Sequence, residues 1–286
     1  MITGKTQLLG VIGYPISHSL SPVMHNAAIN HLNADYVYVP FSIHPEDLST
    51  AIAGLAAISV KGLSVTIPHK ITIMPLLSHI SDRARLVGAV NTVWPGEDGW
   101  HGTNTDVDGF LAPLLAMNRD WSEVNPIILG NGGAARAVIV GCAELGCKEI
   151  KVIGRDREKL NSLRESWANT HLYNLISGHT WEELPDSIGE TGLLINTTPI
   201  GMSPRIEESP VTGEILGLLP AGAIVYDLIY TPRPTKFLQL ARSEGKIVID
   251  GLEMLVQQGA VALQQWLKES APVDVMRQSL EDYLIS

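Results

Sequence analysis

The chain has 286 residues, which is enough for two domains with separate hydrophobic cores. Its composition, 45% hydrophobic and 17% charged, is typical of a globular protein and excludes a disordered chain. The formal net charge of −10 argues against a protein that binds the phosphate backbone of nucleic acids, because such binding depends on clustered Lys and Arg. We therefore expect no nucleic-acid partner.

The first apolar run, Leu8 to Ile12, is too short for a signal peptide or a membrane span, so we expect a cytoplasmic protein without a membrane partner. The two cysteines, Cys142 and Cys147, have no His or Cys partner at a metal-ligand spacing. The sequence therefore predicts two buried cysteines and no metal site.

The first part of the chain alternates predicted strands and helices. Strands are expected at 8–13, 36–41 and 62–65, and helices at 21–32 and 46–57. Ser21 is the expected N-cap of its helix because Pro22 suits the first helical position. Ser17 and Ser19 lie in the loop after the first strand, where two hydroxyls can hold a carboxylated or polyhydroxylated small molecule. Loop serines more often satisfy local backbone groups, so both interpretations stay open.

Two further groups of polar residues follow predicted strands. Thr66 and Lys70 flank Pro68 at a strand-to-helix corner, a common place for a site in α/β proteins, although a lysine there is more often solvated. After a helix at 82–88, a strand beginning at 89 and a hairpin turn at 95–99, Asn104 to Asp106 are dense in hydrogen-bonding groups. Asp106 is a candidate site residue, and its competing role is to cap the helix that follows.

A glycine-rich loop begins the second half of the chain. Residues 126–129 suit a buried strand, 134–145 suit a helix, and Gly130, Gly132 and Ala135 between them form G-x-G-x-x-A. This pattern is typical of dinucleotide-binding folds, in which the helix N-terminus faces the pyrophosphate. The alternative is that the glycines only form a turn.

A second strand, predicted at 149–154, ends where such folds contact the adenosine ribose. Arg155 and Lys159 could pair with a 2′-phosphate, which favours NADP, whereas Asp156 could accept a ribose hydroxyl, which favours NAD. The alternation of strands and helices continues to the end of the chain and predicts a parallel, doubly wound sheet. Helices are expected at 157–167, 235–244, 252–268 and 273–285, and strands at 172–175, 193–196, 224–227 and 246–249.

Taken together and in order, the polar motifs resemble the shikimate dehydrogenase family over nearly the whole chain. The matching blocks are Ser17-His18-Ser19 with Ser21-Pro22, Val65 to Lys70, Gly88 to Thr92, Asn104-Thr105-Asp106 with Gly109, the glycine-rich loop, Asn196 to Met202, and Gly251 with Met254-Leu255-Val256 and Gln258. Two motifs depart from the family pattern: Ser64 replaces a common Asn, and Gly154-Arg155-Asp156 replaces Asn-Arg-Thr.

The resemblance implies reversible, NADP-linked reduction of 3-dehydroshikimate to shikimate, in the route to chorismate and the aromatic amino acids. Lys70 and Asp106 would be the catalytic pair, and either could start the proton transfer. Ser17 and Ser19 would hold the substrate carboxylate. The ring hydroxyls would be bound by Thr66, Asn91, Asp106 and Gln258. The cofactor would be bound by Gly130, Gly132, Gly133, Ala134, Arg155, Lys159, Thr197, Thr198, Met202, Leu228 and Gly251.

The resemblance also implies the domain organisation of an α/β protein. Residues 1–106 would form an α/β substrate domain, 107–250 a Rossmann-type NADP-binding domain, and 251–286 helices that return to the first domain, with closure of the cleft between domains. Asp156 leaves NAD open as a weaker alternative cofactor. Alternative functions are a shikimate and quinate dehydrogenase that also uses NAD, or a non-catalytic NADP-binding regulator, and the protein would be a monomer or a homodimer.

Overall fold

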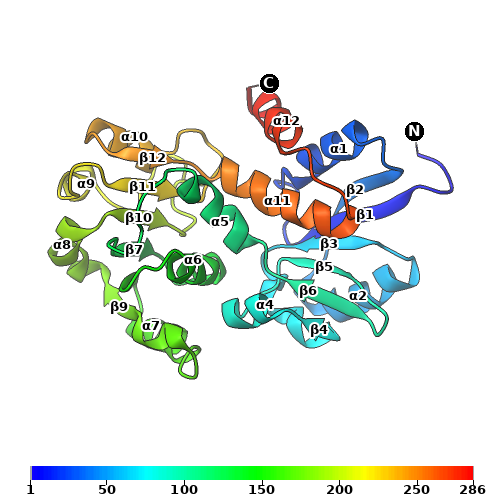
Figure 1. The fold of residues 1–286 in the computed structure, drawn as a ribbon, viewed down its shortest axis with the longest axis horizontal. Coiled ribbons are helices and arrows are strands. Elements are labelled where there is room, and N and C mark those ends of the chain that lie inside the picture. The colour runs from blue at the N-terminus through cyan, green and yellow to red at the C-terminus, as the bar shows by residue number, and fades with distance from the viewer. Residues whose placement is uncertain (1, 286) are drawn as a thin grey trace. The chain divides into compact units, whose positions relative to one another are not determined.

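The computed structural model describes residues 2–285, which form two compact units. The first unit contains residues up to Gly109 together with those from Leu255 onward, and the second contains Phe110–Met254. The boundaries fall inside two helices, α5 (Asp106–Leu115) and α11 (Leu252–Leu267). Each unit contains its own sheet, in agreement with the predicted α/β fold (Figure 1).

The first unit is built on a mixed six-stranded sheet in the order β2-β1-β3-β5-β6-β4. Its strands are β1 (Gln7–Gly13), β2 (Tyr36–Ser42), β3 (Gly62–Val65), β4 (His79–Ile80), β5 (Thr92–Pro95) and β6 (Trp100–Thr103). Strand β1 runs parallel to its neighbours β2 and β3, whereas β5 and β6 form the predicted antiparallel hairpin. Because β1 and β3 are parallel neighbours, the loops after Gly13 and Val65 leave the same edge of the sheet.

Helices cover both faces of this sheet. One face packs on α2 (Leu48–Ala57) and α4 (Asp82–Val87) through apolar side chains that include Leu63 and Val65. On the other face, Ser64 contacts Tyr38, and the Trp266 ring of α11 lies so close to Gly62 that an added Cβ would come within 2.3 Å of it. Helix α12 (Val273–Ile285) packs beside α1 (Ser21–His31), so the C-terminal helices return to the first unit as expected (Figure 1). The remaining helical segments of this unit are the 3-10 turns η1 (Pro45–Asp47) and η2 (Met74–Leu76) and the short helix α3 (His69–Thr72).

The second unit is built on an all-parallel six-stranded sheet in the order β12-β11-β10-β7-β8-β9. Its strands are β7 (Pro126–Leu129), β8 (Ile150–Gly154), β9 (Ile176–Thr180), β10 (Leu193–Asn196), β11 (Ile224–Asp227) and β12 (Ile247–Ile249). The three strands β7, β10 and β11 are buried along their whole length, as parallel strands covered on both faces must be. This burial explains why unbroken apolar runs identified them in the sequence.

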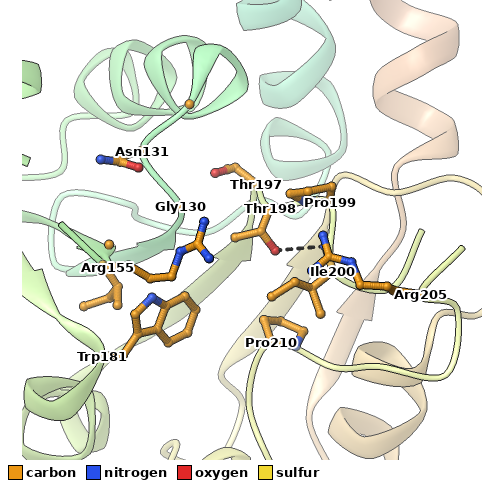
Figure 2. Close-up of a pocket in the computed structure, with 13 residues that line it drawn as sticks. Gly130, Asn131, Arg155, Trp181, Thr197, Thr198, Pro199, Ile200, Arg205 and Pro210 are labelled. Carbon is orange, nitrogen blue, oxygen red and sulfur yellow. Dashed lines mark hydrogen bonds between the residues drawn. The ribbon is translucent and has the colours of Figure 1, made fainter. Parts of the chain in front are cut away.

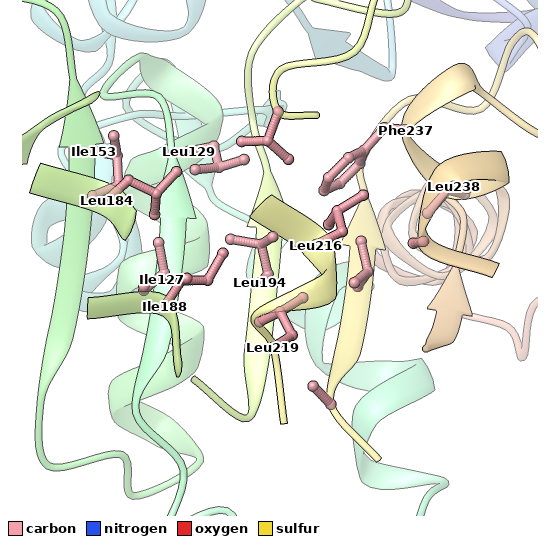
Figure 3. Close-up of a cluster of buried hydrophobic side chains, with 14 residues drawn as sticks. Ile127, Leu129, Ile153, Leu184, Ile188, Leu194, Leu216, Leu219, Phe237 and Leu238 are labelled. Atoms are coloured by element: carbon pink, nitrogen blue, oxygen red, sulfur yellow. The ribbon is translucent and has the colours of Figure 1, made fainter. Parts of the chain in front are cut away.

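Helices pack on both faces of the second sheet, which is the doubly wound arrangement that the sequence predicted. Figure 3 shows one core, where side chains of β7, β10 and β11 meet α8 (Leu184–Ser187), α9 (Gly213–Gly217) and α10 (Lys236–Ser243). On the other face, the Phe110 ring stacks on Tyr226 of β11, with ring centroids 5.5 Å apart, and fills the space above Gly141 in α6 (Gly133–Glu144). The remaining segments are α7 (Arg157–Glu165) and the 3-10 turns η3 (His171–Asn174), η4 (Trp181–Glu183) and η5 (Ile188–Glu190).

The strand expected at 172–175 is wrong. These residues lie in and just after η3, which begins where the Thr170 hydroxyl accepts a hydrogen bond from Leu172 N at 3.2 Å, and the strand β9 follows at Ile176–Thr180. Strand β9 lies at the edge of the sheet, and only Ile176 in it is buried. An edge strand needs no continuous apolar run, so its polar sequence gave no strand signal.

Smaller differences occur at element ends. Helix α1 begins at Ser21 with Leu20 as its N-cap and without a side-chain cap, so the expected Ser21 cap is wrong. The strand expected from Ala89 begins at Thr92. Cys142 and Cys147 are buried and form no disulfide bond. Among residues 2–285, no helix has the length and apolar character that crossing a membrane requires.

Candidate active site

The first unit contains a close ion pair between Lys70 and Asp106. Lys70 Nζ donates a hydrogen bond to Asp106 Oδ2 at 2.6 Å, and the two side chains are 21% and 10% exposed. Their partial burial reduces screening by water, while both remain open enough to be reached by a small molecule. The pair therefore offers a proton donor and a proton acceptor at one place.

Asn91 lies at the centre of the hydrogen bonds around this pair. It is 2% exposed, and its Nδ2 donates to Asp106 Oδ1 at 2.8 Å and to Gln258 Oε1 at 3.4 Å. Its Oδ1 accepts from the Thr105 backbone N–H at 2.7 Å. Asn91 therefore links the start of α5 to α11 and holds the Asp106 carboxylate in one orientation.

Backbone hydrogen bonds place Lys70 beside Asn91. The corner after β3 begins where Thr66 N donates to Ile12 O at 2.9 Å and His69 N donates to Thr66 O at 2.8 Å. Val90 N then donates to Lys70 O at 2.8 Å, next to Asn91 in the chain. The corner predicted at Pro68 thus carries Lys70 to the strand that follows Asn91.

The Asp106 carboxylate is not a helix cap. Its two oxygens accept from Lys70 Nζ and Asn91 Nδ2, and the Asp106 backbone N–H is satisfied by Asn104 Oδ1 at 3.0 Å. Asn104 is in turn buried and donates to Ala89 O at 3.0 Å. The competing explanation of Asp106 as a capping residue is therefore wrong, because its carboxylate points to side chains and not to the first turn of α5.

The other expected substrate residues lie on loops at the same sheet edge. Thr66 is half-buried at the corner after β3, and an added Cβ at Gly13, the last residue of β1, would come within 2.6 Å of its methyl group. Ser17 is exposed and Ser19 half-buried on the loop after β1, where Ser19 Oγ accepts from Ser21 N at 3.4 Å. The structure thus joins Gln258 directly to the Asn91 network and places Thr66 on the Lys70 corner, while the two serines lie on the neighbouring loop.

The glycine-rich loop of the second unit has the backbone that its sequence pattern requires. Gly130 has a φ of +102°, and an added Cβ would come within 2.9 Å of the Thr197 and Thr198 side chains. Gly132 precedes α6, is exposed, and has no neighbouring atom within 4 Å of an added Cβ. The N-terminus of the twelve-residue helix α6 is therefore accessible above Gly132, as a phosphate-binding helix must be.

A pocket of about 420 Å³ opens beside this loop (Figure 2). It is lined by Gly130, Asn131, Gly132, Ile153, Gly154, Arg155, Trp181, Thr197, Thr198, Pro199, Ile200, Arg205 and Pro210. The lining comes from the carboxyl ends of β7, β8 and β10, the edge at which open parallel sheets bind ligands. Five expected cofactor residues thus meet in one pocket: Gly130, Gly132, Arg155, Thr197 and Thr198.

Three charged residues follow β8 and take different positions. Arg155 is exposed and lines the pocket. Asp156 caps α7, since its Oδ1 accepts from Glu158 N at 2.9 Å and from Lys159 N at 3.2 Å. Lys159 is not part of the pocket lining, and its Nζ lies 4.0 Å from Asp156 Oδ2. The carboxylate that favoured NAD is therefore engaged by a helix N-terminus, and Arg155 is the base that faces the pocket.

The remaining expected cofactor residues lie outside the pocket lining. Gly133 and Ala134 form the first turn of α6, and Met202 is 38% exposed on the loop after β10. Leu228 and Gly251 lie against each other, because an added Cβ at Gly251 would come within 2.0 Å of Leu228 O. Gly251 therefore has no room for a side chain.

Three pocket residues, Trp181, Arg205 and Pro210, have no counterpart in the sequence analysis. Trp181 directly follows β9, the strand that the sequence placed wrongly, and Arg205 lies on the loop after β10. In Figure 2, Arg155 and Trp181 lie on one side of the pocket and Ile200 and Arg205 on the other. A correct position for β9 would have identified Trp181 as a residue at the ligand-binding edge, whereas no local pattern marks Arg205.

Residues 2–285 contain no group of three His, Cys, Asp or Glu side chains that could hold a metal ion. The polar groups described above are Lys, Asp, Asn, Gln, Ser, Thr and Arg side chains and backbone N–H groups, which can bind organic substrates and phosphates. Both sites therefore suit small organic ligands.

Comparisons with known proteins agree with this description. Two family models match the chain: the shikimate dehydrogenase substrate binding domain over residues 11–93, and the shikimate 5′-dehydrogenase C-terminal domain over residues 251–281. A shikimate dehydrogenase (NADP(+)) from Microcystis aeruginosa is 65% identical over 280 residues, which cover 98% of each chain.

Solved structures share the fold along almost the full length. A shikimate dehydrogenase in complex with NADP+ has a TM-score of 0.89 and 38% identity, covering 99% of this chain and 98% of that one. A shikimate 5-dehydrogenase from Listeria monocytogenes in complex with shikimate and NAD has a TM-score of 0.87 and 33% identity, covering 98% of both chains. These matches span both units.

Proposed function

The chain belongs to the shikimate dehydrogenase family, and we propose that it reversibly reduces 3-dehydroshikimate to shikimate in the pathway to chorismate and the aromatic amino acids. When bound, NADPH supplies the hydride for the carbonyl carbon. The carbonyl oxygen takes a proton at the same time, and in the reverse direction the hydroxyl loses that proton. The protein must therefore provide a group that gives and takes one proton beside the reacting oxygen.

The observation that carries this proposal is the 2.6 Å contact between Lys70 Nζ and Asp106 Oδ2, beside the buried amide of Asn91. A Lys70 ammonium can stabilise the negative charge that develops on the reacting oxygen and donate a proton to it. Asp106 can accept the proton of the substrate hydroxyl in the oxidising direction. Either group could start the transfer, since each reaches the other directly.

The substrate carries one carboxylate and several hydroxyls, and the first unit has matching groups. We assign the carboxylate to the hydroxyls of Ser17 and Ser19, on the loop after β1. We assign the ring hydroxyls to Thr66, Asn91, Asp106 and Gln258. The hydrogen bond from Asn91 Nδ2 to Gln258 Oε1, at 3.4 Å, is longer than that from Asn91 to Asp106, so a ring hydroxyl could replace it at small cost.

The second unit has the features that NADP requires. The open space above Gly132 leaves room for a pyrophosphate at the N-terminus of α6, where the Gly133 and Ala134 backbone N–H groups can donate. We assign the 2′-phosphate to Arg155, with Lys159 as a second base. Thr197, Thr198, Met202, Leu228 and Gly251 would contact the rest of the cofactor. Because the Asp156 carboxylate caps α7, we expect NADP to be preferred and NAD to be used weakly.

The same proposal gives each part of the chain a role. Residues 1–106 would bind the substrate, 107–250 would bind NADP, and 251–286 would complete the substrate domain through Gln258. We place the enzyme in the cytoplasm as a monomer or homodimer, and light scattering of the purified protein in solution will distinguish these two states.

The test is the absorbance of NADPH formed from NADP+ with shikimate, measured beside quinate and beside Lys70→Ala. We expect turnover with shikimate, weak or no turnover with quinate, and a loss of about 10³-fold in kcat for Lys70→Ala with NADP+ affinity unchanged. Lys61→Ala, which removes an exposed lysine of the same unit, is the matched control and should keep full activity. Binding of NADP+ without turnover of either acid would contradict the proposal and favour a regulator.

A further inference from the structure

A buried carboxylate lies at the end of β11, in the second unit. Asp227 is 0% exposed, and its Oδ1 accepts hydrogen bonds from Asn196 Nδ2 at 2.9 Å and from Ile229 N at 3.2 Å. Its Oδ2 accepts from Thr235 Oγ1 at 2.6 Å. These three donors belong to three segments: the end of β10, the loop after β11, and the residue that caps α10. A single side chain therefore ties three segments together.

The contact with Asn196 extends to the loop that follows β10. Asn196 Nδ2 also donates to Ile200 O at 3.2 Å, while its Oδ1 accepts from Thr198 N at 3.0 Å and from Thr198 Oγ1 at 2.7 Å. The Thr198 hydroxyl in turn accepts from Ile200 N at 3.2 Å, the bond drawn in Figure 2. The conformation of residues 196–200 thus depends on the orientation of the Asn196 amide. The Asp227 carboxylate fixes this orientation by accepting a hydrogen bond from Asn196 Nδ2.

This loop forms one wall of the pocket, through Thr197, Thr198, Pro199 and Ile200. Asp227 itself is not among the lining residues, and neither is Thr235. Asp227 can therefore affect a bound ligand only by acting on the loop.

Stability alone does not account for a carboxylate here. Removing a carboxylate from water is costly, and burial raises the pKa of Asp227 to about 6, with the nearby Asp250 charge acting in the same direction. The direct partners of Asp227 are an amide, a backbone N–H and a hydroxyl, and none of them is a cation. The carboxylate accepts three hydrogen bonds, and the one from Asn196 orients the loop that lines the pocket. A role in positioning that loop would explain why a carboxylate is buried here.

We propose that Asp227 is a positioning residue for NADP: through Asn196, and with Thr235 as its second partner, it holds residues 196–200 in the conformation that binds the cofactor. This inference rests on the proposed function, since it takes the pocket to be the NADP site. Asp227→Ala removes both acceptor oxygens, so Asn196, Ile229 and Thr235 all lose this partner. The loop should then lose its fixed conformation, and NADP should bind more weakly.

The experiment measures the Kd of NADP+ by direct titration, and the KM of each substrate and kcat by steady-state assay. The variants are Asp227→Ala and Thr235→Val, which break the contact from each side, and Thr235→Ser, which keeps the hydroxyl. Thr191→Val is the matched control, because Thr191 is equally buried but precedes β10 at the opposite end of the strand. We expect the Kd and KM of NADP+ to rise about tenfold in Asp227→Ala and Thr235→Val, with the KM of shikimate unchanged, and to stay near wild type in Thr235→Ser and Thr191→Val.

A merely structural role would lower thermal stability without changing the Kd of the folded protein, and that result would overturn the inference. An equal rise in Kd for Thr191→Val would also overturn it. If Asp227→Ala does not fold, the comparison of Thr235→Val with Thr235→Ser decides the question in the same way. Failure of the proposed function is seen separately, as a wild-type protein that does not bind NADP+ or does not oxidise shikimate.

Discussion

The two candidate sites hold their polar groups in different ways. In the first unit, the groups assigned to the substrate hold one another, since Lys70 and Asn91 contact Asp106 at 2.6 and 2.8 Å. In the second unit, the pocket is lined by glycines, threonines, arginines and apolar side chains, and the buried carboxylate of Asp227 is outside this lining. Substitutions in the first site should therefore change the chemical step, whereas substitutions in the second should change cofactor affinity.

The largest effect is expected for Asp106→Asn. The substitution removes the carboxylate that accepts from Lys70, so the proton acceptor is lost while the shape of the side chain is kept. We expect kcat to fall by about 10³-fold while the Kd of NADP+ changes by less than about twofold. The matched control is Asp108→Asn on the same helix, whose carboxylate pairs with Arg83 at 2.6 Å. Equal losses of kcat in both variants would contradict the proposed difference between the two sites.

Next in size is an acid effect on the stability of the first unit. His25 is fully buried, neither of its ring nitrogens has a hydrogen-bond partner among residues 2–285, and burial lowers its pKa from 6.5 to about 3. Between these values the unfolded chain binds more protons than the folded one, so stability falls as the pH drops below 6.5. At pH 5 the loss should be about 2 kcal/mol relative to pH 7. Denaturant titrations of wild type and His25→Phe at both pH values test this, because the variant should lack this part of the pH dependence.

Asp227 should show the opposite sign in the second unit. Burial raises its pKa from 3.8 to about 6, so the folded state binds more protons between these values and stability falls as the pH rises through this window. The stability of wild type relative to Asp227→Asn should therefore decline from pH 4 to pH 7. Hydrogen exchange of β1 amides would report the effect of His25, and hydrogen exchange of β11 amides that of Asp227. If the stability of both units changed with pH in the same direction, the assignment would be contradicted.

A smaller effect, on cofactor affinity alone, is expected for Gly132→Ala. The free protein has space for a methyl group at this position, so the thermal midpoint should stay unchanged, while the methyl would occupy the approach to the α6 N-terminus. We expect the Kd of NADP+ to rise about tenfold, which corresponds to about 1.4 kcal/mol. Gly130→Ala is the contrasting variant, since its φ of +102° and the close Thr197 and Thr198 side chains predict lost stability as well. Unchanged NADP+ affinity in Gly132→Ala would exclude this edge as the pyrophosphate site.

The smallest effect is expected for Arg155→Ala, as a change in cofactor preference. Arg155 lines the pocket, whereas the neighbouring Asp156 carboxylate is held by two backbone N–H groups. Loss of Arg155 should lower kcat/KM for NADP+ several-fold more than for NAD+. Arg157→Ala, which removes an exposed arginine that pairs with Glu183 at 3.1 Å, serves as the control. A change of equal size for both cofactors would place the 2′-phosphate elsewhere, and Arg205 would then be the next residue to replace.

The sequence was sufficient for the buried strands and for the motifs. Residues 62–65, 126–129, 193–196 and 224–227 were predicted with the bounds that the structure has. For the last three, the reason is that parallel strands covered on both faces require mainly apolar runs. The glycine-rich loop could also be predicted from the sequence, because its conformation needs residues without side chains at fixed positions. Strand β9 was placed wrongly because it lies at the edge of the sheet and only one of its residues is buried, so its sequence needs no apolar run.

What tertiary structure decided was which polar groups meet. Asp106 could have capped α5 or joined a site, and only the return of Lys70 and Asn91 to the same place selected the second role. Trp181 reaches the pocket from the 3-10 turn η4 and Arg205 from the loop after β10, and the local sequence specifies neither path. In the sequence, Asp227 is the last residue of a predicted strand. In the structure it contacts Asn196, which is 31 positions away, and Thr235, which is 8 positions away. Apolar periodicity is a local property that the sequence alone shows, whereas the tertiary fold determines which polar groups form hydrogen bonds with one another.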